Sequence, residues 1–366
     1  MVFERLASVT KLGRAASKLY SIFRALVADR RPKLAYVGGW LGKRNLGDEA
    51  LLAATRKLFP GFDLLPFEGD RATQYLARHS TLFRAGLLAG GTLIAQNRWW
   101  LSITESFLQF CPNLAVFGTG VEDASFWPGE TTVGDWLPVL RHCSFVGVGG
   151  PISAELLYSA GLENVEVVGD PVLAFAMNEI NPNPIPKTIG LNIGVSDRRL
   201  WGSERQVCDQ VSRLARVARE SGWTVRWFAV WPKDLRITQE AASNSGTTAC
   251  ITTIYEDHAK FLNRVRSMSV FVGMKLHATI LATCALTPSI MLEYRPKCRD
   301  YMASIGQEDV TFKTDSFRAE EIWEVVQTCH NDRLERAKSL ARTIHALRDK
   351  QQQLAASVAR QLESNA

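Results

Sequence analysis

The feature that most constrains the fold is a repeated unit of a short apolar strand, a glycine turn and a helix. Strands that alternate with helices form parallel sheets covered by helices, so this pattern predicts an α/β fold. The carboxyl ends of parallel strands meet at one edge of the sheet, where open α/β sheets bind their ligands. Four predicted strands in the first half of the chain end in glycine turns, which are Gly38-Gly39, Gly90-Gly91-Thr92, Gly118-Thr119-Gly120 and Gly149-Gly150.

The chain has 366 residues, which is enough for two such units with separate cores. Alternating prolines in residues 181–187 disfavour both helix and sheet and predict a stiff linker. We therefore expect an N-terminal Rossmann-like domain over residues 34–180 and a C-terminal one over 188–317. Residues 318–366 are polar and helix-prone, and we expect a helical tail that packs back on the first domain.

The N-terminal segment, residues 1–33, carries eight Lys or Arg against two Asp or Glu, which equals the net charge of +6 of the whole chain. Its apolar residues recur at roughly helical spacing, so it is predicted to form a basic amphipathic helix. Two interpretations stay open: docking on an anionic membrane surface, or packing on the protein as an ordinary chain end. The remaining chain is neutral, which gives little support for nucleic-acid binding.

No apolar run in the chain is long enough for a signal peptide or a spanning helix. The seven cysteines are odd in number and form no Cys-x-x-Cys pair, which argues against a disulfide framework and a zinc ribbon. The six histidines show no metal-ligand spacing. We expect a cytoplasmic protein without metal or cofactor, peripheral at the inner face of the cytoplasmic membrane if its N-terminal helix docks there.

A candidate anion site lies in the second half of the chain. His277 follows a predicted buried strand and opens a helix, beside Lys275, and the next predicted strand ends in Tyr294-Arg295-Pro296-Lys297. A helix N-terminus and several cations favour a phosphate or a carboxylate. The alternative for His277 is a structural, hydrogen-bonded histidine. We interpret His277 as catalytic and assign donor binding to Lys275, Tyr294, Arg295 and Lys297.

The candidate carboxylate of the first domain is Asp48, in the turn after the first strand. It is interpreted either as a helix-capping acid or as a catalytic acid/base group that faces a sugar hydroxyl. Glycine turns allow a ligand to approach the backbone, and indole rings stack on sugar faces. The candidate acceptor-binding residues are Trp40, Asn45, Gly47, Gly91, Thr92 and Trp99.

Together these residues resemble the polysaccharide pyruvyl transferase family. The resemblance runs from about Leu34 to Asp300 and rests on six short motifs: Asn45-Leu46-Gly47-Asp48-Glu49, Gly90-Gly91-Thr92, Gly118-Thr119-Gly120, Gly169-Asp170-Pro171, Lys275-Leu276-His277-Ala278 and Tyr294-x-Pro296-Lys297. It implies two Rossmann-like domains arranged as in B-type glycosyltransferases. It also implies donor-site roles for His277 and Lys297 and an acid/base role for Asp48.

The same resemblance implies transfer of the pyruvate unit of phosphoenolpyruvate to a sugar as a ketal, with release of phosphate. The acceptor would be a cell-surface polysaccharide or its lipid-linked precursor. The chain departs from the family pattern at two positions. Lys275 replaces an arginine that is usual in the family, and Gly149 occupies a position at which members commonly carry an arginine. A cation that compensates for Gly149 would come from another loop, and the candidates are Arg98, Arg141, Arg198 and Arg295.

Two other functions remain open from the residues alone. A sugar-nucleotide-dependent glycosyltransferase would share the architecture, and it would need an acid for the ribose hydroxyls, for which Glu293 is the candidate. A non-catalytic relative that binds an anion or a glycan is the third possibility, and the glycine at position 149 is its motivation.

Overall fold

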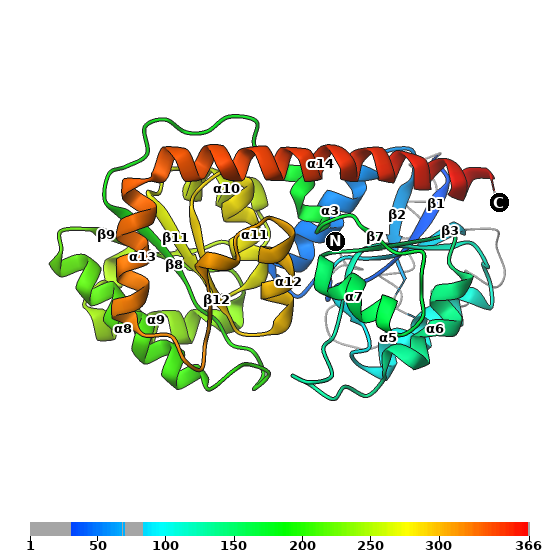
Figure 1. Ribbon diagram of the computed structural model, residues 1–366, viewed down its shortest axis with the longest axis horizontal. Coiled ribbons are helices and arrows are strands. Elements are labelled where there is room, and N and C mark those ends of the chain that lie inside the picture. Colours follow the sequence, from blue (N-terminus) through cyan, green and yellow to red (C-terminus); the bar gives the residue numbers. More distant parts are fainter. Residues whose placement is uncertain (1–30, 68, 70–82, 365–366) are drawn as a thin grey trace, which may run out of the picture.

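Two α/β units lie side by side in the computed structural model, and a long helix crosses both (Figure 1). The structure describes residues 31–67, 69 and 83–364. The predicted basic helix of residues 1–33 therefore lies outside the described residues except for its last three. Within the part of the chain that is described, no helix is both long and apolar enough to cross a membrane.

The first sheet is parallel throughout, and its strands follow the order β2-β1-β3-β5-β6-β7, with β4 paired to β5. The order reverses between β1 and β3, and ligands of open sheets bind at such a switch point. Thr92, predicted to belong to a turn, begins the short strand β4. The elements are β1 (Lys33–Val37), α3 (Leu46–Leu58), β2 (Asp63–Pro66), β3 (Phe83–Ala89), β4 (Thr92–Ile94), α5 (Arg98–Leu108), β5 (Leu114–Val121), α6 (Val133–His142), β6 (Phe145–Val148), α7 (Pro151–Ser159) and β7 (Glu166–Val167).

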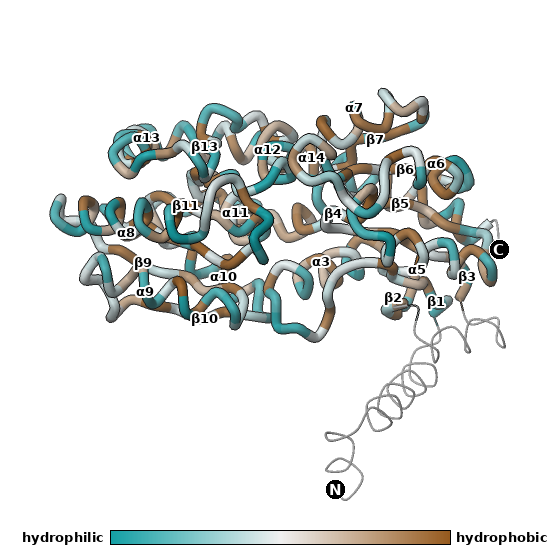
Figure 2. The backbone as a smooth tube through the Cα atoms, turned by 90° about the horizontal axis from the view of Figure 1, so that it is seen from below, coloured by the Kyte–Doolittle hydropathy of each residue, from teal (hydrophilic) through white to brown (hydrophobic). Residues whose placement is uncertain are grey.

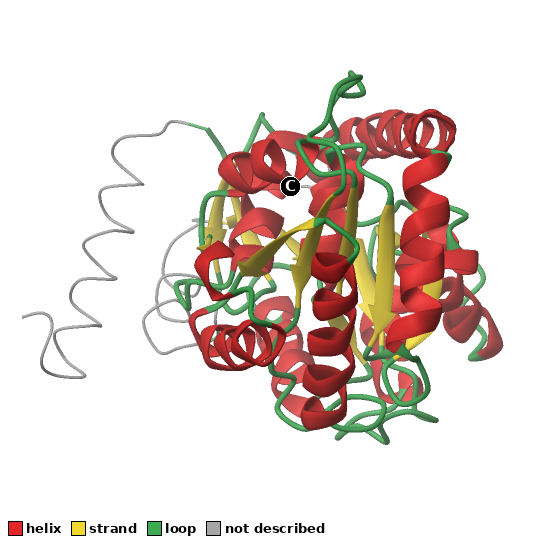
Figure 3. Ribbon diagram, turned by 90° about the vertical axis from the view of Figure 1, so that its left-hand side faces the viewer, coloured by secondary structure: helices red, strands yellow, loops and turns green. Residues whose placement is uncertain are grey.

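The second sheet is also parallel, with the order β10-β9-β8-β11-β12-β13 and a switch point between β8 and β11. Helices cover its strands on both sides (Figure 3). The elements are β8 (Thr188–Asn192), α8 (Glu204–Glu220), β9 (Thr224–Ala229), η2 (Pro232–Asp234), α9 (Leu235–Ser245), η3 (Thr248–Cys250), β10 (Ile251–Thr253), α10 (His258–Arg266), β11 (Val270–Gly273), α11 (Leu276–Cys284), β12 (Ser289–Glu293), α12 (Pro296–Ser304), η4 (Glu308–Val310) and β13 (Thr311–Lys313).

Residues 168–187 connect the two sheets, and they include the 3₁₀ helix η1 (Pro171–Phe175) and the predicted linker. After β13 the chain forms α13 (Ala319–Asn331), which packs on α8, and α14 (Arg333–Ser364). Helix α14 returns to the first domain, where Asn113 Nδ2 donates to the carbonyl of Leu362 at 3.0 Å. These observations confirm the α/β class, the two Rossmann-like units and the C-terminal helical tail.

The two units share one continuous hydrophobic core. Buried residues of α3 and η1 in the first half belong to the same cluster as buried residues of α11 and α14, and α3 and η1 contact α11 directly. A second cluster lies on the other face of the first sheet. Helices α8 and α9 alternate hydrophilic and hydrophobic segments, as expected when only one face of a helix is buried (Figure 2). The shared core fixes the position of one sheet edge relative to the other.

Candidate functional site

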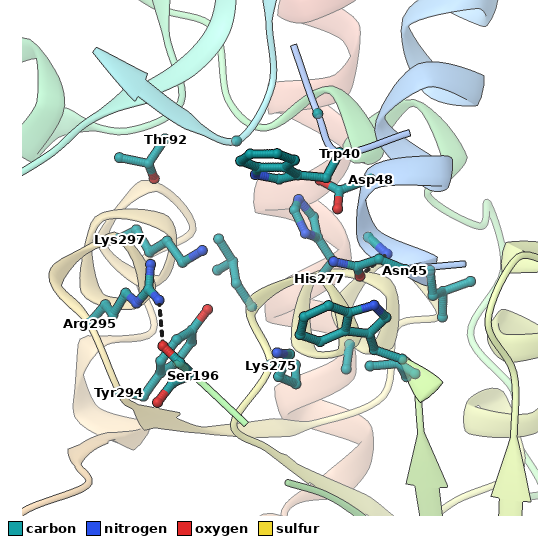
Figure 4. Close-up of a pocket in the computed structure, with 18 of the residues that line it drawn as sticks. Trp40, Asn45, Asp48, Thr92, Ser196, Lys275, His277, Tyr294, Arg295 and Lys297 are labelled. Carbon is teal, nitrogen blue, oxygen red and sulfur yellow. Dashed lines mark hydrogen bonds between the residues drawn. The ribbon is translucent and has the colours of Figure 1, made fainter. Parts of the chain in front are cut away.

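A pocket of ≈ 190 Å³ lies where the carboxyl ends of the two sheets face each other (Figure 4). Its walls are the loops that follow β1 and β3 in the first sheet and β8, β9, β11 and β12 in the second. Both switch points therefore contribute to the same cavity. Eleven of the twelve predicted site residues line it, which are Trp40, Asn45, Gly47, Asp48, Gly91, Thr92, Lys275, His277, Tyr294, Arg295 and Lys297.

His277 is the second residue of α11, and its imidazole lies directly against the backbone of Gly47 in α3. A Cβ atom added to Gly47 would be 2.3 Å from His277 Nδ1, so only glycine permits this approach. On the other side of the ring, Nε2 lies 3.5 Å from Oδ2 of Asp170. Nε2 makes no hydrogen bond within the described structure. The Nδ1 edge therefore faces the start of α3, and the Nε2 edge faces an acid.

Asp48 is in the first turn of α3, but it does not cap the helix. The N-cap is Asn45, whose side-chain oxygen accepts a hydrogen bond from the backbone N–H of Gly47 at 3.2 Å. Burial raises the pKa of Asp48 above its ordinary value, and the nearby His277, the backbone N–H of Trp40 and the cations Lys297 and Lys275 oppose this increase. One carboxylate oxygen, Oδ2, is buried and has no hydrogen bond within the described part of the chain. Such a group is suited to accept a proton from a substrate hydroxyl.

Two cations of the pocket are held by backbone carbonyls. Lys275 Nζ donates to the carbonyl of Val195 at 2.9 Å, and it lies 3.6 Å from Oδ1 of the buried Asp234. Arg295 donates from Nε to the carbonyl of Arg199 at 2.8 Å and from Nη2 to that of Ser196 at 3.1 Å, and Figure 4 shows the latter bond as a dashed line. These contacts fix the position of both charges before any ligand binds.

Lys297 differs from these two cations. Its ammonium lies 5.4 Å from the ring centroid of Tyr294 and has no hydrogen bond or ion pair with any described residue. The Tyr294 ring is buried, and the guanidinium of Arg295 lies 5.2 Å from its centroid. Lys297 is thus the pocket cation whose donors are most available to an anionic ligand.

Two exposed indoles lie at the rim of the pocket on the first domain. Trp40 is 52% exposed and Trp99 is 40% exposed, and their rings stack with centroids 5.3 Å apart and an interplanar angle of 13°. Trp99 is the predicted site residue that does not line the pocket, and it contacts the site through its stacking on Trp40. The ring of Trp40 lies above His277 and Asp48 (Figure 4). An indole in this position can stack on a sugar.

The turn at Gly149 does not contribute to the pocket. The helix α7 that follows it begins at Pro151, and the carboxylate of Asp300 from the other domain accepts hydrogen bonds from the backbone N–H groups of Ile152 at 2.8 Å and of Ser153 at 3.3 Å. This helix N-terminus is therefore occupied by an acid of the protein itself. Of the four arginines considered as compensation, Arg295 lines the pocket, and Arg98, Arg141 and Arg198 do not.

Sequence reasoning did not assign a role to Asp170, the nearest acid to His277. Asp170 belongs to the motif Gly169-Asp170-Pro171, which the sequence already singled out. Its contact with His277 was not predictable, because it depends on the tertiary packing of two segments that are far apart in the chain. Glu293, considered as a ribose-binding acid, is buried and pairs with Arg299, whose Nε donates to Oε2 at 2.9 Å and whose Nη2 lies 2.8 Å from the same oxygen as an ion pair. Among the described residues, no three His, Cys, Asp or Glu side chains cluster as metal ligands.

The fold and the pocket define a two-domain α/β protein with a cationic site in the cleft between its domains. A family model described as polysaccharide pyruvyl transferase matches residues 45–296. The chain belongs to this family, as its motifs predicted, and so to a class of transferases of polysaccharide biosynthesis. A comparison with curated protein sequences gave no match.

Solved structures with the same fold share little sequence with this chain. MnaA of S. aureus, solved with UDP, has 12% identity and a TM-score of 0.54, over 85% of this chain and 91% of that one. A UDP-glucosyltransferase from Polygonum tinctorium has 10% identity and a TM-score of 0.54, over 91% and 99%. UGT2 of Phytolacca americana has 11% identity and a TM-score of 0.51, over 91% and 100%. These similarities confirm the arrangement of B-type glycosyltransferases and show the fold alone.

Proposed function

We propose that this protein transfers the pyruvate unit of phosphoenolpyruvate to a sugar of a cell-surface polysaccharide or of its lipid-linked precursor. The observation that carries the proposal is the pocket itself. An imidazole and a buried carboxylate line the same cavity as three cations, and one of these, Lys297, has no hydrogen bond or ion pair with a described residue. Drug-sized ligands occupy roughly 300–1,000 Å³. The ≈ 190 Å³ cavity suits a smaller, highly charged donor.

The donor-binding residues are Lys275, Arg295 and Lys297, with Tyr294 beneath the last two. We assign the carboxylate and the phosphate of phosphoenolpyruvate to these cations, and the available ammonium of Lys297 forms new bonds when the donor binds. Arg295 supplies the guanidinium that Gly149 does not. Phosphoenolpyruvate is a substrate in this proposal, and the reaction needs no cofactor.

The proposed reaction has two steps. In the first, His277 gives a proton to the methylene carbon of phosphoenolpyruvate, a sugar hydroxyl attacks the neighbouring carbon, and Asp48 takes the proton of that hydroxyl. In the second, another hydroxyl of the same sugar attacks this carbon, the carbon–oxygen bond to phosphate breaks, and the ketal closes. The second hydroxyl gives its proton to His277, and the proton held by Asp48 leaves with the phosphate. Both groups are then ready for another turnover.

The test uses the purified chain with phosphoenolpyruvate and a lipid-linked glycan, and it measures phosphate release together with the mass of the glycan. We expect the mass to increase by one pyruvate ketal. His277→Ala removes the general acid and should lower turnover by about 10²–10⁴-fold. His142→Ala is the matched control, because His142 is exposed, lies outside the pocket and hydrogen-bonds through Nε2 to the carbonyl of Pro112. Full activity of His277→Ala would refute the assignment.

The same assay separates the two alternatives. A sugar-nucleotide donor would release a nucleoside diphosphate, as expected for the UDP-dependent proteins of similar fold. The ion pair between Glu293 and Arg299 argues against a sugar-nucleotide donor. Glu293 lies at the carboxyl end of β12, and because it is paired with Arg299 it is not free to bind the ribose hydroxyls. A binding protein without activity would show saturable association with phosphoenolpyruvate and no release of phosphate.

We also propose that the basic segment of residues 1–33 holds the protein on the inner face of the cytoplasmic membrane, where lipid-linked acceptors lie. Each Lys or Arg near an anionic surface contributes about 1 kcal/mol. The full chain should sediment with phosphatidylglycerol vesicles at low salt and much less with phosphatidylcholine vesicles. A chain of residues 31–366 is the control and should remain in the supernatant. Equal sedimentation of the two chains would contradict the proposal.

A further inference from the structure

The turn at Val168–Asp170 presents the acid that faces His277. Gly169 has a φ of +80°, and Asp170 starts the 3₁₀ helix η1 by accepting a hydrogen bond from the backbone N–H of Val172 on Oδ1 at 2.8 Å. Only Oδ2 is left for His277 Nε2, 3.5 Å away. The direction of this carboxylate therefore follows directly from the backbone of the turn.

One side chain of the C-terminal helix binds all three carbonyls of this turn. Nε2 of Gln351 in α14 donates to the carbonyls of Val168 at 3.1 Å, Gly169 at 3.4 Å and Asp170 at 2.9 Å. Gln351 is fully buried, and its Oε1 has no hydrogen bond with any described residue. An unpaired buried oxygen is unfavourable, because its lost hydrogen bonds to water are not replaced. The amide of Gln351 therefore interacts with the turn through its N–H donors and not through its oxygen.

Helix α14 holds the amide in place from both sides. Arg348 donates to the carbonyl of Ala176 at 3.3 Å and to Oδ1 of Asn178 at 2.7 Å. Further along the helix, Ala355 and Val358 are buried in the shared core. The helix lies across both domains in Figure 1, and none of its residues lines the pocket, so its amide contacts the turn from outside the cavity. A shift of the turn would require this helix to move.

We propose that Gln351 is a positioning residue for His277, which acts by fixing the turn that directs the Asp170 carboxylate at Nε2. The inference rests on the proposed role of His277 in pyruvyl transfer. With its N–H on Nε2 directed at Asp170, the imidazole keeps its Nδ1 edge toward Gly47 and the start of α3. Loss of the Gln351 donors frees the turn, and the ring then samples other orientations and the other tautomer.

The first test compares Gln351→Leu with Gln353→Leu, an exposed position two residues further along the same helix. Gln351→Leu removes the N–H donors at similar volume. We expect kcat to fall about 10- to 100-fold, as for a catalytic group displaced by about 1 Å, with the KM for phosphoenolpyruvate unchanged. In an Asp170→Asn background the same change should have no further effect, because the two residues act in series. Independent, additive effects would overturn the proposal.

The second test does not depend on activity. ¹⁵N NMR of the imidazole at alkaline pH, without substrate, reports which nitrogen of His277 carries the proton. We expect the proton on Nε2 in the wild-type chain and a mixture of tautomers in Gln351→Leu. If no pyruvyl transfer is found but the tautomer changes, the proposed function fails and the positioning role stands. An unchanged tautomer together with an unchanged kcat would overturn the positioning role of Gln351.

A second variant distinguishes a loss of positioning from a defect in folding. Gln351→Met keeps an unbranched side chain of similar length without an N–H donor, and it should reproduce the kinetic and NMR changes of Gln351→Leu. If both variants fail to fold while Gln353→Leu folds, the amide serves the stability of the fold and the positioning role is refuted.

Discussion

The tightest contact of the site joins the backbone of Gly47 to the imidazole of His277. Motif reasoning placed both residues in the site and gave Gly47 a role in acceptor binding. The structure shows a more specific requirement, because the space that a Cβ would fill is already occupied by the ring. Glycine at this position allows the first turn of α3, with Asp48, to lie directly beside His277.

This contact gives a prediction for Gly47→Ala. The new Cβ would lie 2.3 Å from Nδ1 and 2.8 Å from Cγ, so the ring must move, and we expect turnover to fall about 10²-fold. Gly134→Ala is the matched control. Gly134 is also the second residue of its helix, and a Cβ there would be 3.5 Å from Thr132 Oγ1, which is an ordinary contact. Steady-state kinetics of both variants check this, and equal activities would contradict it.

A second residue-scale prediction concerns Asp48 and pH. Burial raises the pKa of Asp48 above its ordinary 3.8, so the folded chain holds this proton more tightly than the unfolded chain. Its contribution to stability is present below pH 3.8 and is lost as the pH rises through the raised value. As a base, Asp48 works only when it is ionised, so activity should fall as the pH drops through the same value.

Asp48→Asn should therefore separate function from stability. We expect turnover to fall about 10²–10⁴-fold, and the free energy of unfolding at neutral pH to increase, with a smaller gain at mildly acidic pH. Urea unfolding at several pH values and the pH dependence of kcat/KM measure the two effects. A variant that is less stable than the wild type at neutral pH would refute the burial argument.

At the scale of elements, most of the strands and helices around the site were predictable from the sequence. Three of the four strands predicted to end in glycine turns do so, since β1 ends at Val37, β3 at Ala89 and β6 at Val148, and apolar runs followed by glycine are local signals. The fourth, β5, continues through the predicted turn Gly118-Thr119-Gly120 to Val121. The short strand β4 and the 3₁₀ helix η1 were not predicted. Both depend on pairing or capping by neighbouring segments, as in the pairing of Thr92 with Gly120 of β5.

Helix α7 shows how an element can depend on another domain. Its N-cap is Gly150, which has no side chain to cap it, and the carboxylate of Asp300 in α12 accepts from Ile152, from Ser153 and from the Ser153 hydroxyl instead. A Cβ on Gly150 would be 2.2 Å from Asp300 Oδ1, so glycine is needed for this contact. Gly149 was interpreted from the sequence as a departure from the family pattern. In the structure, the glycine turn at 149–150 allows the two domains to contact each other.

Asp300→Ala tests this contact. It leaves three donors without their acceptor, and we expect a loss of about 1–3 kcal/mol in the free energy of unfolding. Asp257→Ala is the control, since Asp257 caps α10 within one domain and accepts from the backbone N–H of Lys260. Urea unfolding should show a larger loss for Asp300→Ala. A loss no greater than that of the control would contradict the argument.

At the scale of the whole molecule, the site exists because two sheets meet at their carboxyl edges. Each domain alone presents half of the pocket, with Asp48 on one side and His277 and the cations on the other. The shared core and α14 hold the two halves in register. The positive charge of the pocket comes from Lys275, Arg295 and Lys297 of the second domain, although the chain outside residues 1–33 is neutral overall.

The sequence by itself determined the α/β class, the two repeated units, the helical tail and the motif residues that gather in the pocket. These features follow from local hydrophobic periodicity, glycine turns and short motifs, which need no knowledge of distant contacts. Only the tertiary structure decided that Asp170 faces His277, that Gln351 holds the turn of Asp170, and that Asp300 occupies the start of α7. Such pairs join residues far apart in the chain, and their partners are set by the packing of helices on two facing sheets.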